Sequence, residues 1–285
     1  MPARHFIHQQ GTADANSGRH ARPLPQASTT GLHHSPQPCG SRDSPGRASA
    51  RIGSVKLLAF EASTRRLSVA LWCDGALVEK SADMPNGGSE CLLPWANELL
   101  ADAALGLRQI DGIAFGAGPG GFTGLRLACG VAQGLAFGLD LPVAPVGTLA
   151  ALALAGGPGR VLASLDARMN EIYLAAYAVE GDAVTELLAP QVGAGETVHL
   201  PDGPGWHGAG DGFATPHGDA LRRRMAARLD GVAPATFPTA AAVARLALPV
   251  LAGGAGVDAA QALPLYVRDK VALTTAERLA RGGAR

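Results

Sequence analysis

The sequence is poor in charged and aromatic residues, which make up 17% and 5% of its 285 residues. Lysine and arginine together number 24, as do aspartate and glutamate, so the formal net charge is zero. Six arginines but only two acids fall within residues 1–54, which leaves 18 basic and 22 acidic residues for the rest. This remainder lacks the broad positive surface with which a protein binds nucleic acid unaided. Any action on RNA therefore needs a partner.

Several motifs of catalysis and metal binding are also absent from the sequence. No GxxxxGK[ST] loop occurs, which argues against a Walker ATPase, and no GxSxG elbow marks a serine nucleophile. The histidines beyond residue 54 show neither HxxxH nor HExxH spacing; they are His199, His207 and His217. The four cysteines form no CxxC pair, so we expect buried thiols, a reducing cytoplasmic setting and no metal site.

Uninterrupted apolar stretches are short. The longest, such as residues 141–154, are broken by Pro142, Pro145 and Gly147. A helix that spans a bilayer needs about 20 consecutive apolar residues. The sequence therefore predicts no membrane-spanning segment.

Residues 1–54 differ in composition from the rest of the chain. They are rich in Pro, Gly, Ser, Arg and His, and no helical or strand period runs through them, so we expect a disordered tail. The excess of arginine over acid resembles a transit peptide, but the proline clusters and the His33–His34 pair do not fit one. A miscalled start is the favoured explanation, because Val55 immediately precedes the first convincing strand.

The remaining chain has an α/β pattern that occurs twice. A strand followed by a hairpin begins at residue 55 and again at residue 160. This coarse repeat predicts two lobes of the same design, an N-terminal lobe over residues 55–156 and a C-terminal lobe over residues 157–272, with residues 273–285 frayed. Ser89 is the expected N-cap of the first helix. Helices are predicted at about residues 89–103, 123–139, 148–155, 218–229 and 239–251.

A glycine-rich loop over residues 116–126 joins a predicted strand to a predicted helix. Its Gly-x-Gly-x-x-Gly spacing matches the dinucleotide-binding fingerprint in form, and Asp140 follows at about the usual distance of roughly 20 residues. However, Asp140 precedes the next strand instead of ending it, and Pro119 removes one amide donor from the loop. The sequence therefore disfavours nicotinamide or flavin binding.

The helix behind this loop carries a glycine at every fourth position, at Gly130, Gly134 and Gly138. Each glycine costs a helix about 1 kcal/mol relative to alanine, so this row needs an external reason. Close packing against another backbone supplies one. That backbone belongs either to the protein's own sheet or to a second protein, and the sequence leaves both explanations open.

Two acids that end predicted strands are candidate site residues: Glu61 in the first half of the chain and Asp166 in the second. Asp166 is the first of four polar residues that lie between two apolar runs; the others are Arg168, Asn170 and Glu171. We interpret this group first as a hairpin turn closed by an Asp166–Arg168 contact, with catalysis as the alternative. Exposed ion pairs are common and contribute only about 0–1 kcal/mol.

Several motifs are specific when taken together. GPGxFTGLR occupies residues 118–126 and DAR occupies residues 166–168; the others are Lys56–Thr64, Ser68–Trp72, Ala132–Ala136 and Pro264-x-Tyr266-x-Arg268. Over about residues 55–272 the chain thereby resembles the TsaB (YeaZ) family. The resemblance implies an actin-like, Hsp70-like two-lobed ATPase fold of ribonuclease H-like repeats. It also implies membership in the bacterial machinery that places threonylcarbamoyl on N6 of adenosine 37 in tRNAs reading ANN codons.

The resemblance assigns catalysis to the paralogue TsaD, whose helix bears an HxxxH metal pair where this chain has no histidine in residues 89–94. It implies a noncatalytic subunit that dimerises with TsaD, works with the ATPase TsaE and meets tRNA only through the complex, while TsaC makes the threonylcarbamoyl-adenylate. Self-dimers are expected without TsaD. A glycoprotease-like hydrolase, as older naming of the family has it, or a weak ATPase is the alternative.

The resemblance also implies site residues. Family dimers form through two helices, here at about residues 89–103 and 123–138, and the expected interface residues are Leu92, Trp95, Leu99, Arg126, Gly130, Gly134 and Gly138. The candidate nucleotide-binding residues are Glu61, Gly118, Gly120 and Asp166. The family has Asp where this chain has Glu61, and Ser where it has Gly121. We therefore expect no intrinsic cofactor, and ATP or ADP only within the complex.

Overall fold

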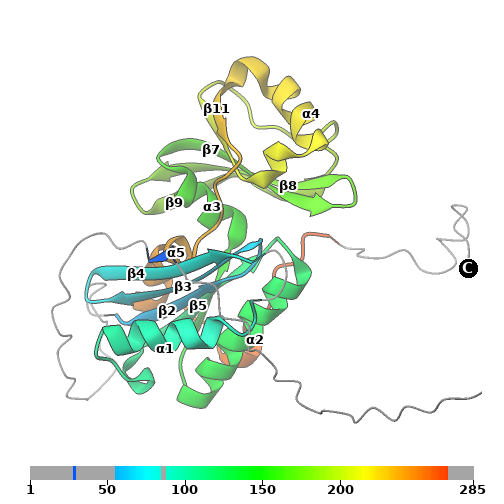
Figure 1. Ribbon diagram of the computed structural model, residues 1–285. Coiled ribbons are helices and arrows are strands. Elements are labelled where there is room, and N and C mark those ends of the chain that lie inside the picture. The colour runs from blue at the N-terminus through cyan, green and yellow to red at the C-terminus, as the bar shows by residue number, and fades with distance from the viewer. Residues whose placement is uncertain (1–27, 30–54, 85–87, 269–285) are drawn as a thin grey trace, which may run out of the picture.

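The computed structural model describes residues 28–29, 55–84 and 88–268. Figure 1 shows two lobes stacked one above the other, with helix α3 (Thr148–Gly156) between them. Each lobe is built on one mixed sheet, six-stranded in the N-terminal lobe and five-stranded in the C-terminal lobe. The predicted two-lobed α/β fold is thereby confirmed.

The N-terminal lobe has the strand order β1-β4-β3-β2-β5-β6. Strands β2, β3 and β4 form an antiparallel meander, whereas β5 runs parallel to β2, and β6 runs parallel to β5. β2 and β5 are buried along their whole length, which explains their unbroken apolar sequences. The strands are Ser28–Thr29 (β1), Leu57–Glu61 (β2), Arg66–Cys73 (β3), Ala76–Asp83 (β4), Gly112–Gly118 (β5) and Val143–Gly147 (β6).

The C-terminal lobe repeats the topology of strands β2 to β6. Its order β11-β10-β7-β8-β9 again places an antiparallel meander, β7 to β9, beside two parallel strands. The repeat predicted from the sequence is therefore a duplication of topology. The strands are Gly159–Arg168 (β7), Glu171–Glu180 (β8), Ala183–Gly193 (β9), Trp206–Ala209 (β10) and Leu229–Ala233 (β11).

Helices cover both faces of each sheet. Helices α1 (Leu92–Asp102) and α2 (Phe122–Leu139) lie side by side on one face of the N-terminal sheet (Figure 1). Helix α5 (Ala240–Ala252) covers its opposite face. The C-terminal sheet is covered by α3 on one face and by α4 (Pro216–Met225) on the other. Short 3₁₀ helices are Leu107–Gln109, Asp211–Ala214, Ala226–Arg228 and Ala259–Gln261.

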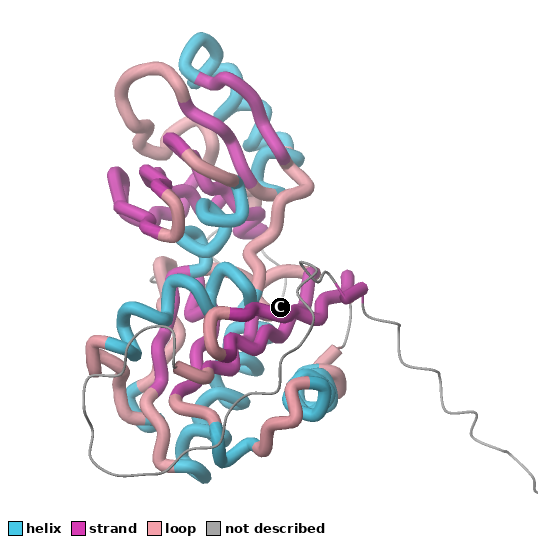
Figure 2. The backbone as a smooth tube through the Cα atoms, turned by 90° about the vertical axis from the view of Figure 1, so that its left-hand side faces the viewer, coloured by secondary structure: helices cyan, strands magenta, loops and turns pink. Residues whose placement is uncertain are grey.

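The chain leaves the N-terminal lobe through α3 and returns to it after β11, and Figure 2 shows both lobes with the segments that join them. The returning segment carries Phe237, which is buried. The guanidinium groups of Arg65 and Arg66 lie 4.9 and 5.1 Å from the centroid of its ring. The return path is therefore fixed against the loop between β2 and β3.

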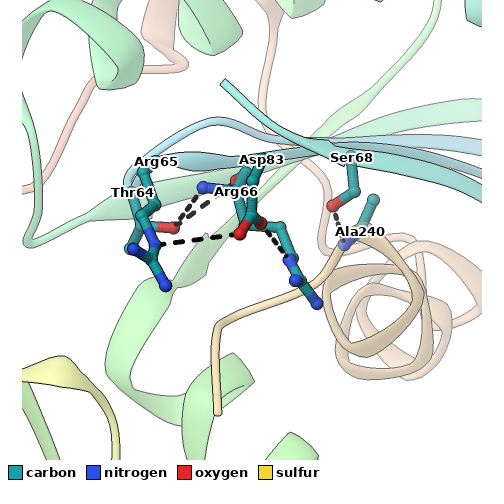
Figure 3. A network of polar contacts seen from close by, with 6 residues as sticks. All are labelled: Thr64, Arg65, Arg66, Ser68, Asp83 and Ala240. Carbon is teal, nitrogen blue, oxygen red and sulfur yellow. Dashed lines mark hydrogen bonds and ion pairs between the residues drawn. The ribbon is translucent and has the colours of Figure 1, made fainter. Parts of the chain in front are cut away.

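Polar contacts fix the start of α5 on the N-terminal sheet. The Ser68 hydroxyl on β3 accepts a hydrogen bond from the Ala240 amide at 2.8 Å, as Figure 3 shows. The Glu79 carboxylate on β4 accepts another from the Ala241 amide at 2.8 Å. These acceptors satisfy amides in the first turn of the helix, which have no partner within the helix itself. In the same figure Asp83 pairs with Arg66, the first residue of β3, at 2.8 Å.

The first helix starts later than predicted. Its N-cap is Cys91, which makes no side-chain capping hydrogen bond, and the Ser89 hydroxyl contacts Glu90 instead. Ser89 therefore does not cap α1. The end of the helix predicted over residues 218–229 also differs, because Leu229 starts β11, which pairs with β10. Pairing with a distant strand outweighs the local helical pattern there.

One short strand lies in a segment for which none was expected. Ser28–Thr29 pair antiparallel with β4, although the sequence showed no strand period in residues 1–54. The expectations for residues 1–27, 30–54 and 269–285 otherwise lie outside the described residues.

Two glycines of α2 provide a matched test of this packing. A Cβ at Gly124 would overlap the carbonyl oxygen of Ala62, whereas a Cβ at Gly130 would meet nothing within 4 Å. We expect Gly124→Ala to lower the free energy of unfolding by about 1–3 kcal/mol. Gly130→Ala should raise it by up to about 1 kcal/mol through helix propensity. Urea unfolding of the monomer measures both, and equal effects of the two substitutions would contradict the packing described.

Candidate functional site

A cavity of about 740 Å³ opens between the two lobes. Residues 119–125 of the glycine-rich loop line its N-terminal wall, and residues 165–169 of the DAR segment line its C-terminal wall. Residues 265–268 line it as well. The two most specific sequence motifs, from different halves of the chain, thus meet at one cleft. A cavity with convergent polar groups is the default candidate for a functional site.

The glycine-rich loop owes its composition to the segment directly beneath it. A Cβ at any of three loop glycines would overlap atoms of residues 61–63; these glycines are Gly116, Gly120 and Gly124. At Gly120 and Gly124 the absence of a side chain allows two backbones to approach closely, and at Gly116 it leaves room for the Glu61 carboxyl. The Gly121 amide donates a hydrogen bond to the Ser63 carbonyl at 2.6 Å, so this amide is used inside the protein.

Gly118 is also explained by packing. Its φ of 117° lies in a region that favours glycine, and a Cβ there would lie 2.8 Å from the Leu265 carbonyl oxygen. Its amide donates to the Thr148 hydroxyl at 3.0 Å. Neither Gly118 nor Gly120 therefore needs a ligand to account for its presence.

Glu61 lies beneath the loop, fully buried, and does not line the cavity. Its Oε1 accepts a hydrogen bond from the Ser63 amide at 2.6 Å, while Oε2 has no hydrogen-bond partner among the described residues. Burial raises the pKa of this carboxyl above its usual range, and contacts with Ser63 offset only part of the rise. The structure therefore does not present the Glu61 side chain to the cleft.

The DAR segment ends β7 and leads into the turn to β8. The Arg168 amide donates to Asp166 Oδ1 at 2.8 Å, and the Arg168 guanidinium lies 3.1 Å from Asp166 Oδ2. The predicted Asp166–Arg168 contact is thus present. Arg168, Met169 and Asn170 have left-handed φ values of 60°, 53° and 63°. This conformation costs about 1–2 kcal/mol for each non-glycine residue, so surrounding contacts must hold the turn.

Asp211 is a cleft residue that the sequence analysis did not single out. Its Oδ1 accepts a hydrogen bond from the Asp166 amide at 3.0 Å. Burial raises the pKa of Asp211 above its usual range, and the charge of Asp166 adds to the rise. No local pattern marks Asp211 in the sequence, because β10 brings it beside Asp166 from a distant part of the chain. Within the described residues, no group of three His, Cys, Asp or Glu side chains is placed to hold a metal ion.

Comparison with known proteins places the chain in a family. The family model described as "TsaD: tRNA N6-adenosine threonylcarbamoyltransferase" matches residues 88–263. The Escherichia coli K12 protein named "tRNA threonylcarbamoyladenosine biosynthesis protein TsaB" is 33% identical over 240 residues, which cover 76% of this chain and 96% of that protein. The chain belongs to the TsaB (YeaZ) family.

Two further relatives agree with this assignment. The Haemophilus influenzae protein of the same name is 45% identical over 124 residues, which cover 42% of this chain and 52% of that TsaB protein. The solved structure titled "YeaZ from Pseudomonas aeruginosa" aligns with a TM-score of 0.69 at 39% identity, covering 74% of this chain and 99% of that chain. The TsaB fold therefore extends over both lobes.

In this TsaB-family chain, the helix pair α1–α2 has an outer surface that we call the helix-pair face. A shallow cavity of about 410 Å³ runs along it, lined by Leu93, Arg126, Leu127, Gly130, Val131, Gly134 and Leu135. Phe137 lies on the same helix and is 83% exposed. A Cβ on each glycine of the row, Gly130, Gly134 and Gly138, would meet nothing within 4 Å. Contact with the protein's own sheet therefore does not explain the row.

Three residues expected at a TsaB-type interface lie elsewhere. Leu92, Trp95 and Leu99 are 0%, 5% and 2% exposed and pack in the core of the N-terminal lobe. Their helical spacing marks the face of α1 that contacts the sheet. The expectation that these three residues lie at an interface is therefore wrong. Leu93, which is 47% exposed, takes their place on the helix-pair face. Arg126 and the three glycines lie on the exposed side of α2, as expected.

Among the described helices, α2 is long and apolar enough to cross a membrane, with 18 residues and a mean hydropathy of 1.3. No such segment was expected from the sequence, because its longest apolar stretches are interrupted by proline and glycine. Residues on the inner side of α2 are buried; they are Leu125, Ala128, Cys129, Ala132 and Ala136. The contact of α2 with the N-terminal core therefore explains part of its apolar composition.

The buried carboxyl of Glu61 predicts a pH dependence of stability. Because its folded-state pKa is raised, the native state binds more protons than the unfolded state at pH values between the usual 4.5 and the raised pKa. Stability contributed by this group therefore falls as the pH rises through that window. Relative to wild type, Glu61→Gln should become progressively more stable with rising pH, by up to about 1.4 kcal/mol per pH unit.

Thermal unfolding of both proteins at several pH values measures this difference. Glu180→Gln is the matched control, because Glu180 is exposed. A stability difference between Glu61→Gln and wild type that does not change with pH would contradict the account of this buried carboxyl.

Proposed function

We propose that this protein takes part in the biosynthesis of threonylcarbamoyladenosine in tRNA, as a noncatalytic cytoplasmic subunit that docks on TsaD through the helix-pair face. The glycine row carries the proposal. Three exposed glycines weaken α2 by about 1 kcal/mol each, and none has a packing partner among the described residues. A partner helix that lies directly against the backbone of α2 explains all three.

TsaD is the proposed occupant because the TsaD family model matches residues 88–263, a stretch that contains both α1 and α2. Two chains with the same helix pair can pack these pairs about a pseudo-twofold axis, so that each fills the groove of the other. The relatives named TsaB support the pathway. A second copy of this chain also fits the surface, so a self-dimer is expected when TsaD is absent.

The noncatalytic role is supported by how the cleft uses its polar groups. Glu61 is buried away from the cavity, and the Asp166 carboxylate is engaged by Arg168. The Gly118 and Gly121 amides bond within the chain. These groups are therefore not arranged to bind and transfer a phosphate. ATP or ADP is proposed to act only within the complex, where TsaE supplies the ATPase and tRNA is reached through the partners.

The docking proposal predicts the effect of a bulky side chain in the glycine row. Gly134→Leu should weaken binding to TsaD by at least about tenfold, because the leucine separates the two helix backbones. Its own fold should persist, because a Cβ at Gly134 meets nothing within 4 Å. Size-exclusion chromatography of the mixture and titration calorimetry measure the binding, and circular dichroism checks the fold.

Ala227→Leu is the control, since it also introduces a leucine, at an exposed position in the C-terminal lobe. It should bind TsaD like wild type. Wild-type binding by folded Gly134→Leu, or no complex between the wild-type protein and TsaD, would overturn the docking proposal.

The alternative is a glycoprotease-like hydrolase or a weak ATPase. It draws on one observation, the neighbouring acids Asp166 and Asp211 in the cleft. We expect the isolated protein to turn over neither ATP nor peptides in colorimetric and fluorogenic assays. Turnover that is abolished by Asp166→Asn would favour the enzyme over the noncatalytic subunit.

A further inference from the structure

The last described residues, Leu263–Arg268, form a segment that we call the clasp, which lines the cleft and contacts both lobes. It follows Ala262, whose carbonyl accepts hydrogen bonds from the Gln133 side-chain amide at 3.0 Å and from the Cys129 thiol at 3.2 Å. The Leu265 amide donates to the Ala117 carbonyl on β5 at 2.7 Å. The start of the clasp is therefore fixed to the N-terminal lobe.

Tyr266 joins the clasp to the first turns of α2. Its ring centroid lies 5.6 Å from that of Phe122, and its hydroxyl accepts a hydrogen bond from Arg126 Nε at 3.3 Å. The Arg126 guanidinium also lies 3.7 Å from the centroid of the Phe122 ring. Because Arg126 lines the helix-pair face as well, a single side chain belongs both to that face and to the contacts of the clasp.

Arg268 joins the clasp to the C-terminal lobe. Its guanidinium, on a side chain only 15% exposed, pairs with the Glu171 carboxylate and donates to the Ala167 carbonyl at 3.1 Å. A third contact reaches the Met169 sulfur at 3.4 Å. These contacts surround the β7–β8 turn with its three left-handed residues. A turn of this kind persists only where neighbouring groups hold it, which makes it sensitive to Arg268.

We propose that the clasp couples the helix-pair face to the β7–β8 turn and hence to the cleft. A partner that fixes Arg126 also fixes Tyr266, and through the short segment that follows it stabilises the Arg268–Glu171 pair. This inference rests on the proposed docking of TsaD. Coupling between two sites is reciprocal, so loosening the turn weakens docking on the helix-pair face. Glu171 and Arg268 are positioning residues, because they act on that face through Arg126.

Hydrogen–deuterium exchange of the full chain, with and without TsaD, tests this coupling. In the wild type, TsaD should slow exchange both in α1–α2 and at the amides of residues 167–170. Glu171→Gln breaks the ion pair between the clasp and the C-terminal lobe. In this variant the slowing in α1–α2 should remain, and the slowing at residues 167–170 should be lost. A turn that TsaD contacts directly would be slowed equally in both proteins, and that result would overturn the proposal.

The affinity for TsaD provides the reciprocal measurement. Glu171→Gln should weaken TsaD binding by about fivefold, at the lower end of usual coupling factors. Tyr266→Phe, which removes only the hydroxyl that accepts from Arg126, should do the same from the other end of the clasp. Asp182→Asn is the matched control, because it breaks the 3.0 Å Arg245–Asp182 pair, which joins α5 to the C-terminal lobe without contacting α2. It should leave TsaD affinity unchanged.

The outcomes separate this inference from the proposed function. Absence of TsaD binding by the wild-type protein would overturn both. Normal TsaD binding by the wild type and equally strong binding by Glu171→Gln and Tyr266→Phe would overturn the coupling alone. An equal loss of affinity in Asp182→Asn would show a general effect of lobe contacts, and would also overturn the specific role of the clasp.

Discussion

The close approach of the glycine-rich loop to residues 61–63 is the constraint on which the candidate sites depend. The loop lies so near this segment that side chains at Gly116, Gly120 or Gly124 would overlap it. This contact fixes the direction in which α2 leaves the sheet. One side of α2 then packs in the N-terminal core, its first turn faces the cleft, and its glycine row faces outward. The cleft and the helix-pair face are thus both lined by residues of the same helix, α2.

Much of the fold could be predicted because local pattern and burial agree. Strands β2 and β5 are buried on both faces, so their sequences are apolar without interruption and easily recognised. The recurring hairpins revealed the duplicated topology, and the polarity of residues 166–171 revealed a turn. β11 could not be recognised, because Leu229–Ala233 has no strand pattern of its own and depends on its pairing with β10.

The candidate site was less predictable, for a different physical reason. The family resemblance indicates which helices form an interface but not which of their side chains face outward, so Leu92 was expected at an interface although it is buried in the core. The sequence also could not show what packs on the glycine row, whereas the structure shows that no other described residue lies within 4 Å of a Cβ built there. Asp211 joins Asp166 only through tertiary structure, and no sequence spacing encodes their contact. Family resemblance located the motifs, whereas the coordinates determined which side chains face outward.

The return of the chain to the N-terminal lobe has a consequence for synthesis. Helix α5, residues 240–252, packs on one face of the N-terminal sheet. It buries apolar side chains of β2 and β3 that would otherwise be exposed on that face. Domains fold as units, in general from the N-terminus onward, while the chain emerges from the ribosome. Here the first lobe stays incomplete until the second has been made, so the apolar face of its sheet is exposed throughout most of translation. The segment that completes the core of the N-terminal lobe is thus synthesised after every strand of the C-terminal lobe.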